Sequence, residues 1–497
     1  MAIRSRVIWV GSPAPPAIVN ALSERDLSLA EKRNAACEAE LPSSCAVVIN
    51  ISPGRPLDDE ITGLIANAFM HGLLAFVLAP LTEIDALRRK LDGLPFGKRV
   101  KLWAVRVASR IPELSARSAP GLSYSPSVKL VGCDDCSPED VVLLRRAFSD
   151  CGEVTFTRMA QGGAAVFQAY ARLNDSRAGP YPLPFFVKMD RYPKILRELE
   201  NYQVCTTHFI PFFSRPNLDP HRCLLGAERG LIVGNFVEHS DSLAEQVNRG
   251  TAQAAINSLF EDALRGWRTQ AYLSVSGVQE GPLVNSVLGT FSENARQRAN
   301  TYAREAQPFG ATLTAVKIAK LLDDLPPIRH RRALCHGDLH GENVRVRSGQ
   351  AILIDFAAVD HGPLVIDPAA LETALVLRAP GRQSIEWMEF SDELYAVENL
   401  RTLPQLRSPT APLNPLWNSV RQIRRFGLAE QVSSDEYARA VAVHLLRHGL
   451  RKRGNDEDRG RRPFFVWLAE RLALDLTSSA SFCPPYMVSP GWKSGDS

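Results

Sequence analysis

The chain has 497 residues, of which 45% are hydrophobic and 23% charged, and its formal net charge is +4. No apolar run reaches the roughly 20 residues that cross a bilayer, and so small a charge over this length gives no sign of a nucleic-acid partner. We therefore expect neither a membrane nor a nucleic-acid partner, and the length predicts two or three domains.

Nine cysteines are spread along the chain. The first eleven residues lack the long apolar core of a secretory signal, so we expect a cytoplasmic protein with reduced thiols. Cys133 and Cys136 form one C-x-x-C motif, followed by Cys151. A structural zinc site needs four ligands, and neither a second pair nor a nearby histidine completes the set, so we predict no zinc there.

The first 135 residues alternate short apolar runs with helical stretches, which predicts a doubly wound α/β domain of the flavodoxin-like kind. The stretch 111–127 is rich in Ser, Pro and Arg and predicts a linker. The expected strands are 6–10, 45–51, 73–78 and 100–107, and the expected helices are 17–24, 58–71 and 83–91.

This N-terminal region resembles a response-regulator receiver in size and strand pattern. A receiver carries a phosphorylatable aspartate at the end of its third strand and acidic residues after its first. Here Asn50 ends one strand and Ser12 follows another. We therefore expect a degenerate receiver-like domain, or a module that binds a protein partner.

The next region begins with an expected helix, 138–148, and continues into strands at 154–160, 165–173 and 184–190. Gln161–Ala164 separates the first two strands and contains two adjacent glycines, which suit a turn. From residue 378 the chain is expected to be largely helical. A charged stretch, 447–462, is expected to be a solvated loop before an apolar helix at 464–476.

The strongest chemical signal is the sequence C-H-G-D-L-H-G-E-N-V at 335–344, followed by I-L-I-D-F at 352–356. A phosphoryl transfer needs a carboxylate beside the acceptor hydroxyl and magnesium to neutralise the phosphate oxygens. Asp338 suits the base, and Asn343 and Asp355 offer the oxygen ligands that Mg²⁺ prefers. Residues 344–354 can fold as a hairpin that returns Asp355 beside Asn343.

These motifs resemble those of aminoglycoside phosphotransferases and choline kinases, relatives of the protein kinases. They also resemble bacterial phosphotransferase-like domains joined to signalling modules. The resemblance implies a bilobal kinase-like fold: an N-lobe at 136–238, a C-lobe at 239–377 and a helical region at 378–497. It implies Asp338 as catalytic base, Asn343 and Asp355 as magnesium ligands, His336 as a loop-shaping residue and Asp367 as a loop anchor.

The same family places a lysine on the third strand of its N-lobe, and Lys188 occupies the middle of an apolar run. A lysine in such a run is costly unless it is paired. Glu198 and Glu200 on the following helix are the candidate partners, and only one can face the strand. We prefer Glu198, and the choice stays open.

The resemblance also implies where ATP would bind. The glycine turn would cover the phosphates, the lysine would hold them, and the backbone after the strand at 230–235 would bond the adenine. The implied nucleotide-binding residues are Gly162, Gly163, Lys188, Phe236, Val237 and Glu238.

These patterns predict an ATP- and Mg²⁺-dependent phosphotransferase that moves the γ-phosphate of ATP onto a hydroxyl of an unidentified small molecule or protein. The alternative is a pseudokinase-like module that binds nucleotide and acts through a protein partner of residues 1–135. Acids and aromatics between Glu386 and Tyr395 would suit a cationic acceptor, although we prefer an ordinary amphipathic helix. Arg421, Arg424, Arg425 and the charged stretch 447–462 would suit nucleic acid, although a solvated loop is preferred.

Overall fold

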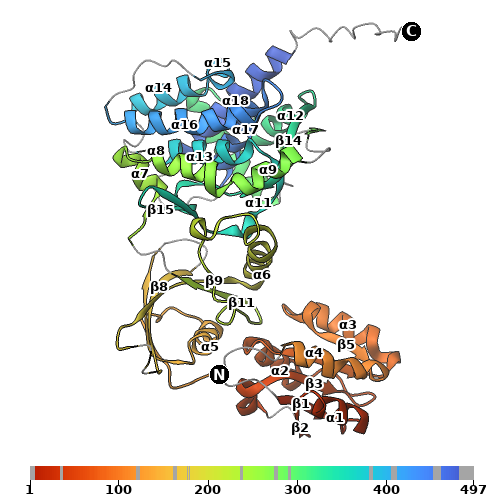
Figure 1. Cartoon of the computed structure of the whole chain (residues 1–497). Helices are drawn as coiled ribbons and strands as arrows, with labels where there is room; N and C mark the ends of the chain where they lie inside the picture. The colour runs from red at the N-terminus through yellow and green to blue at the C-terminus, as the bar shows by residue number, and fades with distance from the viewer. Residues whose placement is uncertain are drawn as a thin grey trace, which may run out of the picture. The chain divides into compact units, whose positions relative to one another are not determined.

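The computed structural model (Figure 1) falls into two compact units, Met1–Gln203 with Pro216–Glu238, and Val204–Arg215 with His239–Ser497. Within these units the structure describes residues 6–33, 37–118, 124–159, 165–175, 177, 179–235, 239–273, 278–281, 283–288, 293–379, 384–403, 411–451 and 461–480.

The first unit opens with a five-stranded sheet whose strands are all parallel, in the order β2-β1-β3-β4-β5. Alternate residues of β1 serve two cores, because successive side chains of a strand point to opposite faces. Ile8 packs with the helices α2 and α3, and Trp9 packs with α1 and the start of α4. The elements are β1 (Arg6–Gly11), α1 (Pro16–Ser23), β2 (Ser28–Lys32), β3 (Ser44–Asn50), α2 (Asp59–Met70), β4 (Leu74–Ala79), α3 (Ile84–Asp92), β5 (Lys101–Ala104) and α4 (Ile111–Ser118).

Three features of this domain differ from the sequence prediction. The predicted strand 100–107 ends at Ala104, where a 3-10 helix, Val105–Arg110, begins. Strand β2 was not predicted, because S-L-A-E-K is a partly exposed edge strand without an apolar run. The predicted linker is wrong over Ile111–Ser118, which forms α4 and buries Ile111 completely. The Ser, Pro and Arg content hid the apolar positions with which this helix covers the sheet.

The rest of the first unit is a six-stranded sheet in the order β10-β11-β9-β8-β7-β6. Its strand pairs are antiparallel except β6 with β7. Helix α5 begins at a capping box in which Ser137 and Asp140 exchange hydrogen bonds. The elements are β6 (Lys129–Val131), α5 (Pro138–Ala147), β7 (Cys151–Arg158), β8 (Ala165–Leu173), β9 (Leu183–Arg191), α6 (Tyr192–Asn201), β10 (Leu224–Leu225) and β11 (Arg229–Asn235).

The second unit is mainly helical, with two three-stranded sheets. Its strands are β12 (Asp241–Ser242), β13 (Val278–Gly281), β14 (Ile328–Cys335), β15 (Val344–Arg347), β16 (Gln350–Leu353) and β17 (Asp360–Pro363). Its helices are α7 (Leu243–Arg249), α8 (Gln253–Asn257), α9 (Arg265–Leu273), α10 (Val284–Leu288), α11 (Glu293–Ala306), α12 (Ala315–Asp323), α13 (Ile366–Leu377), α14 (Ile385–Leu394), α15 (Val397–Arg401), α16 (Asn414–Glu430), α17 (Glu436–Leu450) and α18 (Arg461–Ala480).

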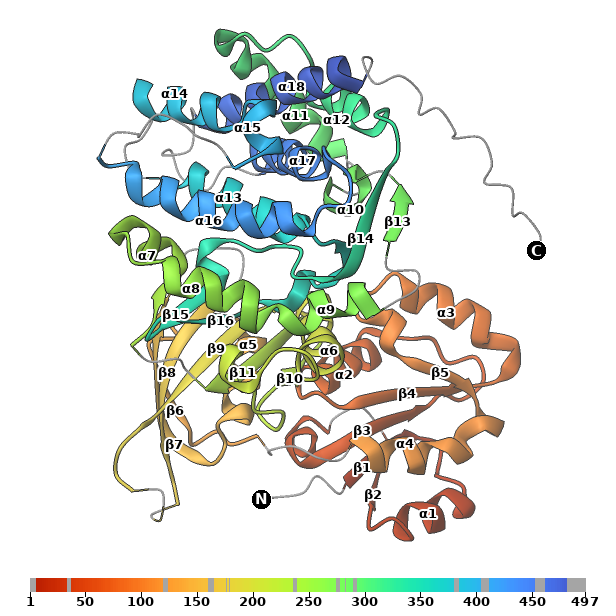
Figure 2. The ribbon, with the colours of Figure 1, turned by 45° about the horizontal axis from the view of Figure 1, so that its top comes forward.

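Helices α13 and α17 form the interior of this unit. Every residue of α13 is buried, as is every residue of α17 except Arg447, and α17 packs against α13 and α18 (Figure 2). A polar cluster joins three helices: Arg424 of α16 and Tyr437 of α17 both donate to the Glu372 carboxylate of α13. Because all three side chains are buried, these contacts fix how the helices pack.

Two further expectations were wrong. Cys133 and Cys136 are joined by a disulfide, because the turn of the C-x-x-C motif brings their Cα atoms to 5.4 Å. The predicted solvated loop 447–462 is wrong at both ends, because Arg447 belongs to α17 and Arg461 and Arg462 are buried in α18. Among the described residues, every helix is too short or too polar to cross a bilayer.

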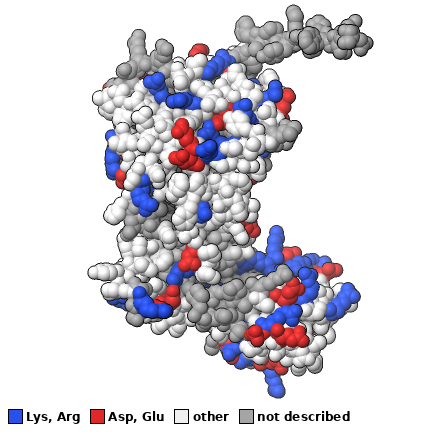
Figure 3. Space-filling model, viewed as in Figure 1, with Lys and Arg blue, Asp and Glu red and all other residues white. Residues whose placement is uncertain are grey.

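Charge on the surface is mixed. On the face shown in Figure 3, basic side chains of the N-terminal α/β domain are interspersed with acidic ones. Of the three arginines that could suggest nucleic acid, Arg424 is completely buried against Glu372. A buried arginine that is paired within the fold cannot contact a phosphate backbone.

Candidate active site

The C-H-G-D-L-H-G-E-N-V motif begins at the last residue of β14, and a buried carboxylate on α13 holds the loop that it forms. The backbone N–H groups of His336 and Gly337 donate to Asp367, with distances of 2.7 and 3.0 Å to Oδ2 and Oδ1. Gly337 has φ +74°, and an added Cβ would lie 2.4 Å from the Ala358 carbonyl oxygen, so only glycine fits. The prediction that Asp367 anchors the loop is confirmed.

His336 links the loop to the strand that precedes Asp355. Its ring is buried, and its Nε2 lies 3.0 Å from the Ile354 carbonyl oxygen. The structure thus gives His336 the loop-shaping position that the sequence predicted. It has a packing and hydrogen-bonding role in the described structure rather than an exposed, reactive one.

The predicted hairpin brings Asp355 back to the loop. Strands β15 and β16 pair from Val344 with Leu353 to Arg347 with Gln350, and the turn residues Ser348 and Gly349 both have positive φ. A two-residue turn of this kind suits the twist of a hairpin. The Ile354 N–H then donates to the Asn343 carbonyl oxygen at 3.0 Å, which places Asp355 next to Asn343 in the fold.

Asn343 and Asp355 offer the oxygen ligands of a magnesium site in which phosphates supply other ligands of the ion. The Asn343 Nδ2 group donates to the Asp338 carbonyl oxygen at 3.0 Å, which leaves the amide Oδ1 for a cation. Asp355 has φ +66°, a strained conformation that clusters at functional sites. Among the described residues, no group of three or more His, Cys, Asp or Glu could hold a metal by itself. One carboxylate and one amide fit Mg²⁺, which usually keeps waters and substrate phosphates as its other ligands.

Two arginines that the sequence did not single out contact the proposed base. Arg447 Nη2 lies 3.4 Å from Asp338 Oδ1, and Arg451 also donates to this oxygen. Arg447 further donates to the Gly337 carbonyl oxygen at 2.9 Å. Burial alone would raise the pKa of Asp338, but Arg451 and Arg447 outweigh burial and lower this pKa to about 2. The carboxylate is therefore held ionised between two guanidinium groups.

The neighbouring histidine is held neutral. Burial lowers the pKa of His340 to about 4, and the nearby positive charges of Arg378 and Arg451 act in the same direction, against the attraction of Asp338. A neutral His340 adds no positive charge to the two guanidiniums near Asp338. The basic character of this place therefore comes from the arginines.

In the first unit, Lys188 forms a buried ion pair. Its Nζ lies 2.7 Å from Glu198 Oε2, and the two side chains are only 8% and 7% exposed. Lys188 lies on β9, between β8 and β11, and Glu198 lies on α6. Glu200 is exposed, so the structure selects Glu198 as the partner. A buried lysine needs such a partner because an unpaired buried charge is costly.

The other implied nucleotide-binding residues cannot be placed. The glycines of the predicted phosphate-covering turn and the predicted adenine-binding segment lie outside the described residues. These are Gly162, Gly163, Phe236, Val237 and Glu238.

The acidic and aromatic residues between Glu386 and Tyr395 do not form a cationic-acceptor pocket. Trp387, Phe390 and Tyr395 are buried in the core, whereas Glu386, Glu389 and Glu393 are exposed. The helix is amphipathic, which is the interpretation we preferred from the sequence.

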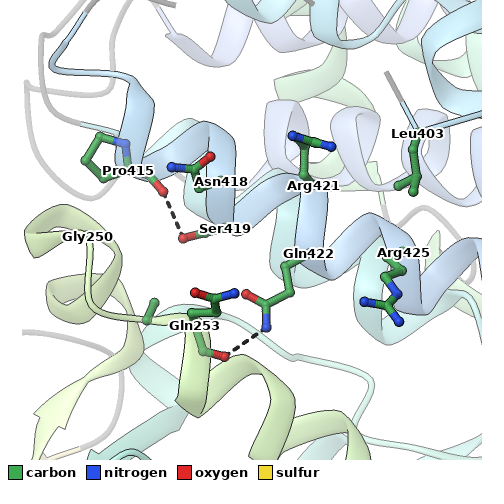
Figure 4. Close-up of a pocket in the computed structure, with 10 residues that line it drawn as sticks. Gly250, Gln253, Leu403, Pro415, Asn418, Ser419, Arg421, Gln422 and Arg425 are labelled. Atoms are coloured by element: carbon green, nitrogen blue, oxygen red, sulfur yellow. Dashed lines mark hydrogen bonds between the residues drawn. The ribbon is translucent and has the colours of Figure 1, made fainter. Parts of the chain in front are cut away.

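A separate pocket of about 680 Å³ lies between α8 and α16 (Figure 4). Gln422 of α16 donates across it to the Gln253 carbonyl oxygen of α8 at 2.8 Å, and Arg421 and Arg425 of the same helix also line the pocket. Among the described residues, those that line this pocket include no predicted catalytic or metal-binding residue.

Residues 285–413 match the model of the phosphotransferase enzyme family, APH, and this span contains Asp338, Asn343 and Asp355. The match identifies this part of the chain as a phosphotransferase domain. Together with the β9–α6 ion pair and the loop and hairpin of the second unit, the match confirms the predicted protein kinase-like fold.

No curated protein matches the chain significantly. Solved structures that it resembles include an amicoumacin kinase in complex with AMP-PNP, Ca²⁺ and Ami, with 15% identity over 69% of this chain and 94% of that one and a TM-score of 0.35. A glucosamine kinase in complex with glucosamine, ADP and inorganic phosphate has 13% identity over 63% and 92%, with a TM-score of 0.33. An aminoglycoside phosphotransferase from Streptomyces rimosus has 14% identity over 66% and 97%, with a TM-score of 0.30.

Proposed function

We propose that the chain transfers the γ-phosphate of ATP to a hydroxyl group, with Asp338 as the catalytic base and Mg²⁺ held by Asn343 and Asp355. One observation carries this proposal. Asp367 anchors the loop, and the β15–β16 hairpin joins this loop to Asp355. It assembles a carboxylate, an amide and a second carboxylate within the segment that matches a phosphotransferase family.

In the proposed reaction, the acceptor hydroxyl gives its proton to Asp338 as its oxygen forms a bond to the γ-phosphorus. The bond from that phosphorus to the bridging oxygen breaks, and ADP leaves with the electron pair. Bound Mg²⁺ would neutralise charge on the phosphate oxygens. Lys188, oriented by Glu198, would hold the phosphates of ATP, and the undescribed glycine turn and adenine-binding segment would complete the nucleotide site.

We also propose that the N-terminal α/β domain is a receiver-like module that binds a partner without being phosphorylated itself. Its strand order, β2-β1-β3-β4-β5, is that of flavodoxin-like folds. Asn50, rather than an aspartate, ends β3, and its side chain donates to the Ser12 carbonyl oxygen at 3.2 Å. An amide in this place cannot accept a phosphoryl group as a carboxylate can. We further propose 136–238, 239–377 and 378–497 as N-lobe, C-lobe and helical region.

The test of the enzymatic proposal is ATP consumption by the purified full chain, with Mg²⁺ and with EDTA, together with a measurement of nucleotide binding. We expect Mg²⁺-dependent consumption that increases when a suitable hydroxyl acceptor is added. Absence of ATP binding would contradict the proposal. Binding without transfer to any acceptor would favour the pseudokinase-like alternative.

A further inference from the structure

Arg99 of the N-terminal α/β domain lies between two aromatic rings that belong to different parts of the first unit. Its guanidinium carbon is 4.1 Å from the ring centre of Phe69, on α2, and 3.9 Å from that of Tyr192, the first residue of α6. A guanidinium placed over ring faces at such distances is attracted to both rings. Arg99 also donates through Nη1 to the carbonyl oxygen of Gly226, in the turn between β10 and β11.

The turn that Arg99 contacts is tied to the start of α6. The Tyr192 N–H donates to the Glu228 carbonyl oxygen at 2.7 Å. Ala227, in the same turn, is 8% exposed and belongs to the same buried core cluster of the α/β domain as Phe69. Arg99 therefore holds together three neighbouring pieces, which are the end of α2, the β10–β11 turn and the start of α6.

The helix that begins at Tyr192 carries the partner of Lys188. Glu198 follows on the same ten-residue helix, after a rise of about 9 Å. The helix packs closely on β11, since a Cβ added at Gly230 would lie 2.7 Å from the Cβ of Ile195. The Glu198 carboxylate accepts from Lys188 Nζ at 2.7 Å. Because so short a helix moves as one rigid piece, the position of its start determines where Glu198 lies.

We propose that Arg99 is a positioning residue for the proposed nucleotide site: it fixes the start of α6 and so keeps Glu198 against Lys188. The proposal rests on the proposed function, in which Lys188 holds the phosphates of ATP. Arg99 acts through Tyr192 and the helix, and not by touching the nucleotide. The α/β domain then contributes to nucleotide binding in addition to binding a partner.

A different account of the same contacts is that Arg99 only fastens the α/β domain to its neighbours. The two accounts differ in what the loss of Arg99 does to the nucleotide site. If Arg99 acts through α6, its removal weakens nucleotide binding, and this loss disappears once Glu198 can no longer form its ion pair with Lys188. If Arg99 only fastens the domain, its removal lowers stability and leaves nucleotide affinity unchanged.

The experiment measures the affinity of the full chain for AMP-PNP at saturating Mg²⁺ by calorimetry. The first variant is Arg99→Ala, and the second is Tyr192→Leu, which removes the ring from α6 and leaves the residues of the α/β domain unchanged. Lys98→Ala, at the exposed neighbouring position, is the matched control. Arg99→Ala is also made in a Glu198→Gln background, which completes a double-mutant cycle. Hydrogen exchange of the α6 and β3 amides is followed in each protein, so that movement of the helix is distinguished from unfolding of the α/β domain.

We expect Arg99→Ala and Tyr192→Leu each to lower AMP-PNP affinity roughly 3- to 30-fold and to speed exchange in α6, whereas the control behaves as wild type. In the Glu198→Gln background, the further loss caused by Arg99→Ala should be less than about twofold. The proposal is overturned if Tyr192→Leu binds AMP-PNP as wild type does, or if Arg99→Ala costs as much affinity with Glu198→Gln as without it. Failure of the proposed function shows separately, as wild-type protein that does not bind AMP-PNP.

Discussion

Lys188 and Asp338, one in each unit, meet their charged partners in different ways. Lys188 and Glu198 are ten residues apart, on a strand and the helix that follows it, and both are almost fully buried. Asp338 instead meets Arg447 and Arg451, more than 100 residues away, and all three remain partly exposed. The first pair satisfies a buried charge within one piece of local structure. The second set of side chains remains partly exposed to solvent.

The largest expected effect concerns the partly exposed site and its cation. Asp355→Ala should remove most of the Mg²⁺ dependence of nucleotide binding, because it takes away the one carboxylate that the hairpin brings beside Asn343. Binding of a fluorescent ATP analogue, titrated with Mg²⁺ in wild type and variant, measures this. An unchanged Mg²⁺ dependence would place the metal elsewhere.

The buried pair should show its effect in stability. Glu198→Ala leaves Lys188 buried without its carboxylate, and we expect a loss of about 3–5 kcal/mol in the free energy of unfolding. Urea unfolding of the full chain measures it, and Glu200→Ala on the exposed face of α6 is the matched control. Equal losses in the two variants would show that Glu198 carries no special role.

A smaller effect is expected at the polar cluster that joins the interior helices. The Tyr437 hydroxyl donates to Glu372 Oε2 at 2.7 Å, and both groups are buried. Tyr437→Phe should cost about 1.5–3 kcal/mol of stability, because a hydrogen bond to a buried charge is lost. Tyr181→Phe, at a position that is 83% exposed, is the control and should change stability by less than about 0.5 kcal/mol. A cost no larger than that of the control would rule out this role for Tyr437.

The smallest effects are changes of stability with pH, and they should have opposite signs at two carboxylates. Arginine contacts lower the pKa of Asp338 to about 2, whereas burial raises the pKa of Glu436 to about 7. Stabilisation from Asp338 should be present above its unfolded pKa, near 4, and be lost as the pH falls towards 2. Glu436 should destabilise the fold increasingly as the pH rises from its unfolded pKa, also near 4, towards 7.

Unfolding measured from pH 2 to pH 8 for wild type, Asp338→Asn and Glu436→Gln tests both signs. Asp338→Asn should lie closer to wild type at low pH than at neutral pH. Glu436→Gln should gain relative to wild type as the pH rises towards 7. The same pH dependence in both variants would contradict the assigned environments.

The sequence predicted those parts of the fold and site that local patterns determine. The alternation of apolar runs predicted the α/β domain, and residues 344–354 were predicted to fold as the hairpin that returns Asp355. Lys188 stood out because a lysine is costly in an apolar strand. The kinase-like fold was implied by the resemblance of the motifs to those of a known family, and the family match at 285–413 supports it.

What the sequence did not predict depends on distant partners. Strand β2 is polar and joins the sheet only through its edge pairing with β1. Arg447 and Arg451 lie in a strongly charged stretch that suggests a solvated loop, and only the packing of α17 against α13 brings them to Asp338. The sequence held one sign that Arg447 is not in a loop: it lies within a long apolar helix pattern.

The most direct test of the central claim compares phosphate transfer by wild type and Asp338→Asn, with Asp323→Asn at the exposed end of α12 as the matched control. ATP affinity is measured alongside. We predict that Asp338→Asn slows transfer about 10²- to 10⁴-fold while ATP affinity stays within a few-fold of wild type, and that the control behaves as wild type. Wild-type turnover in Asp338→Asn would contradict the assignment of Asp338 as the base.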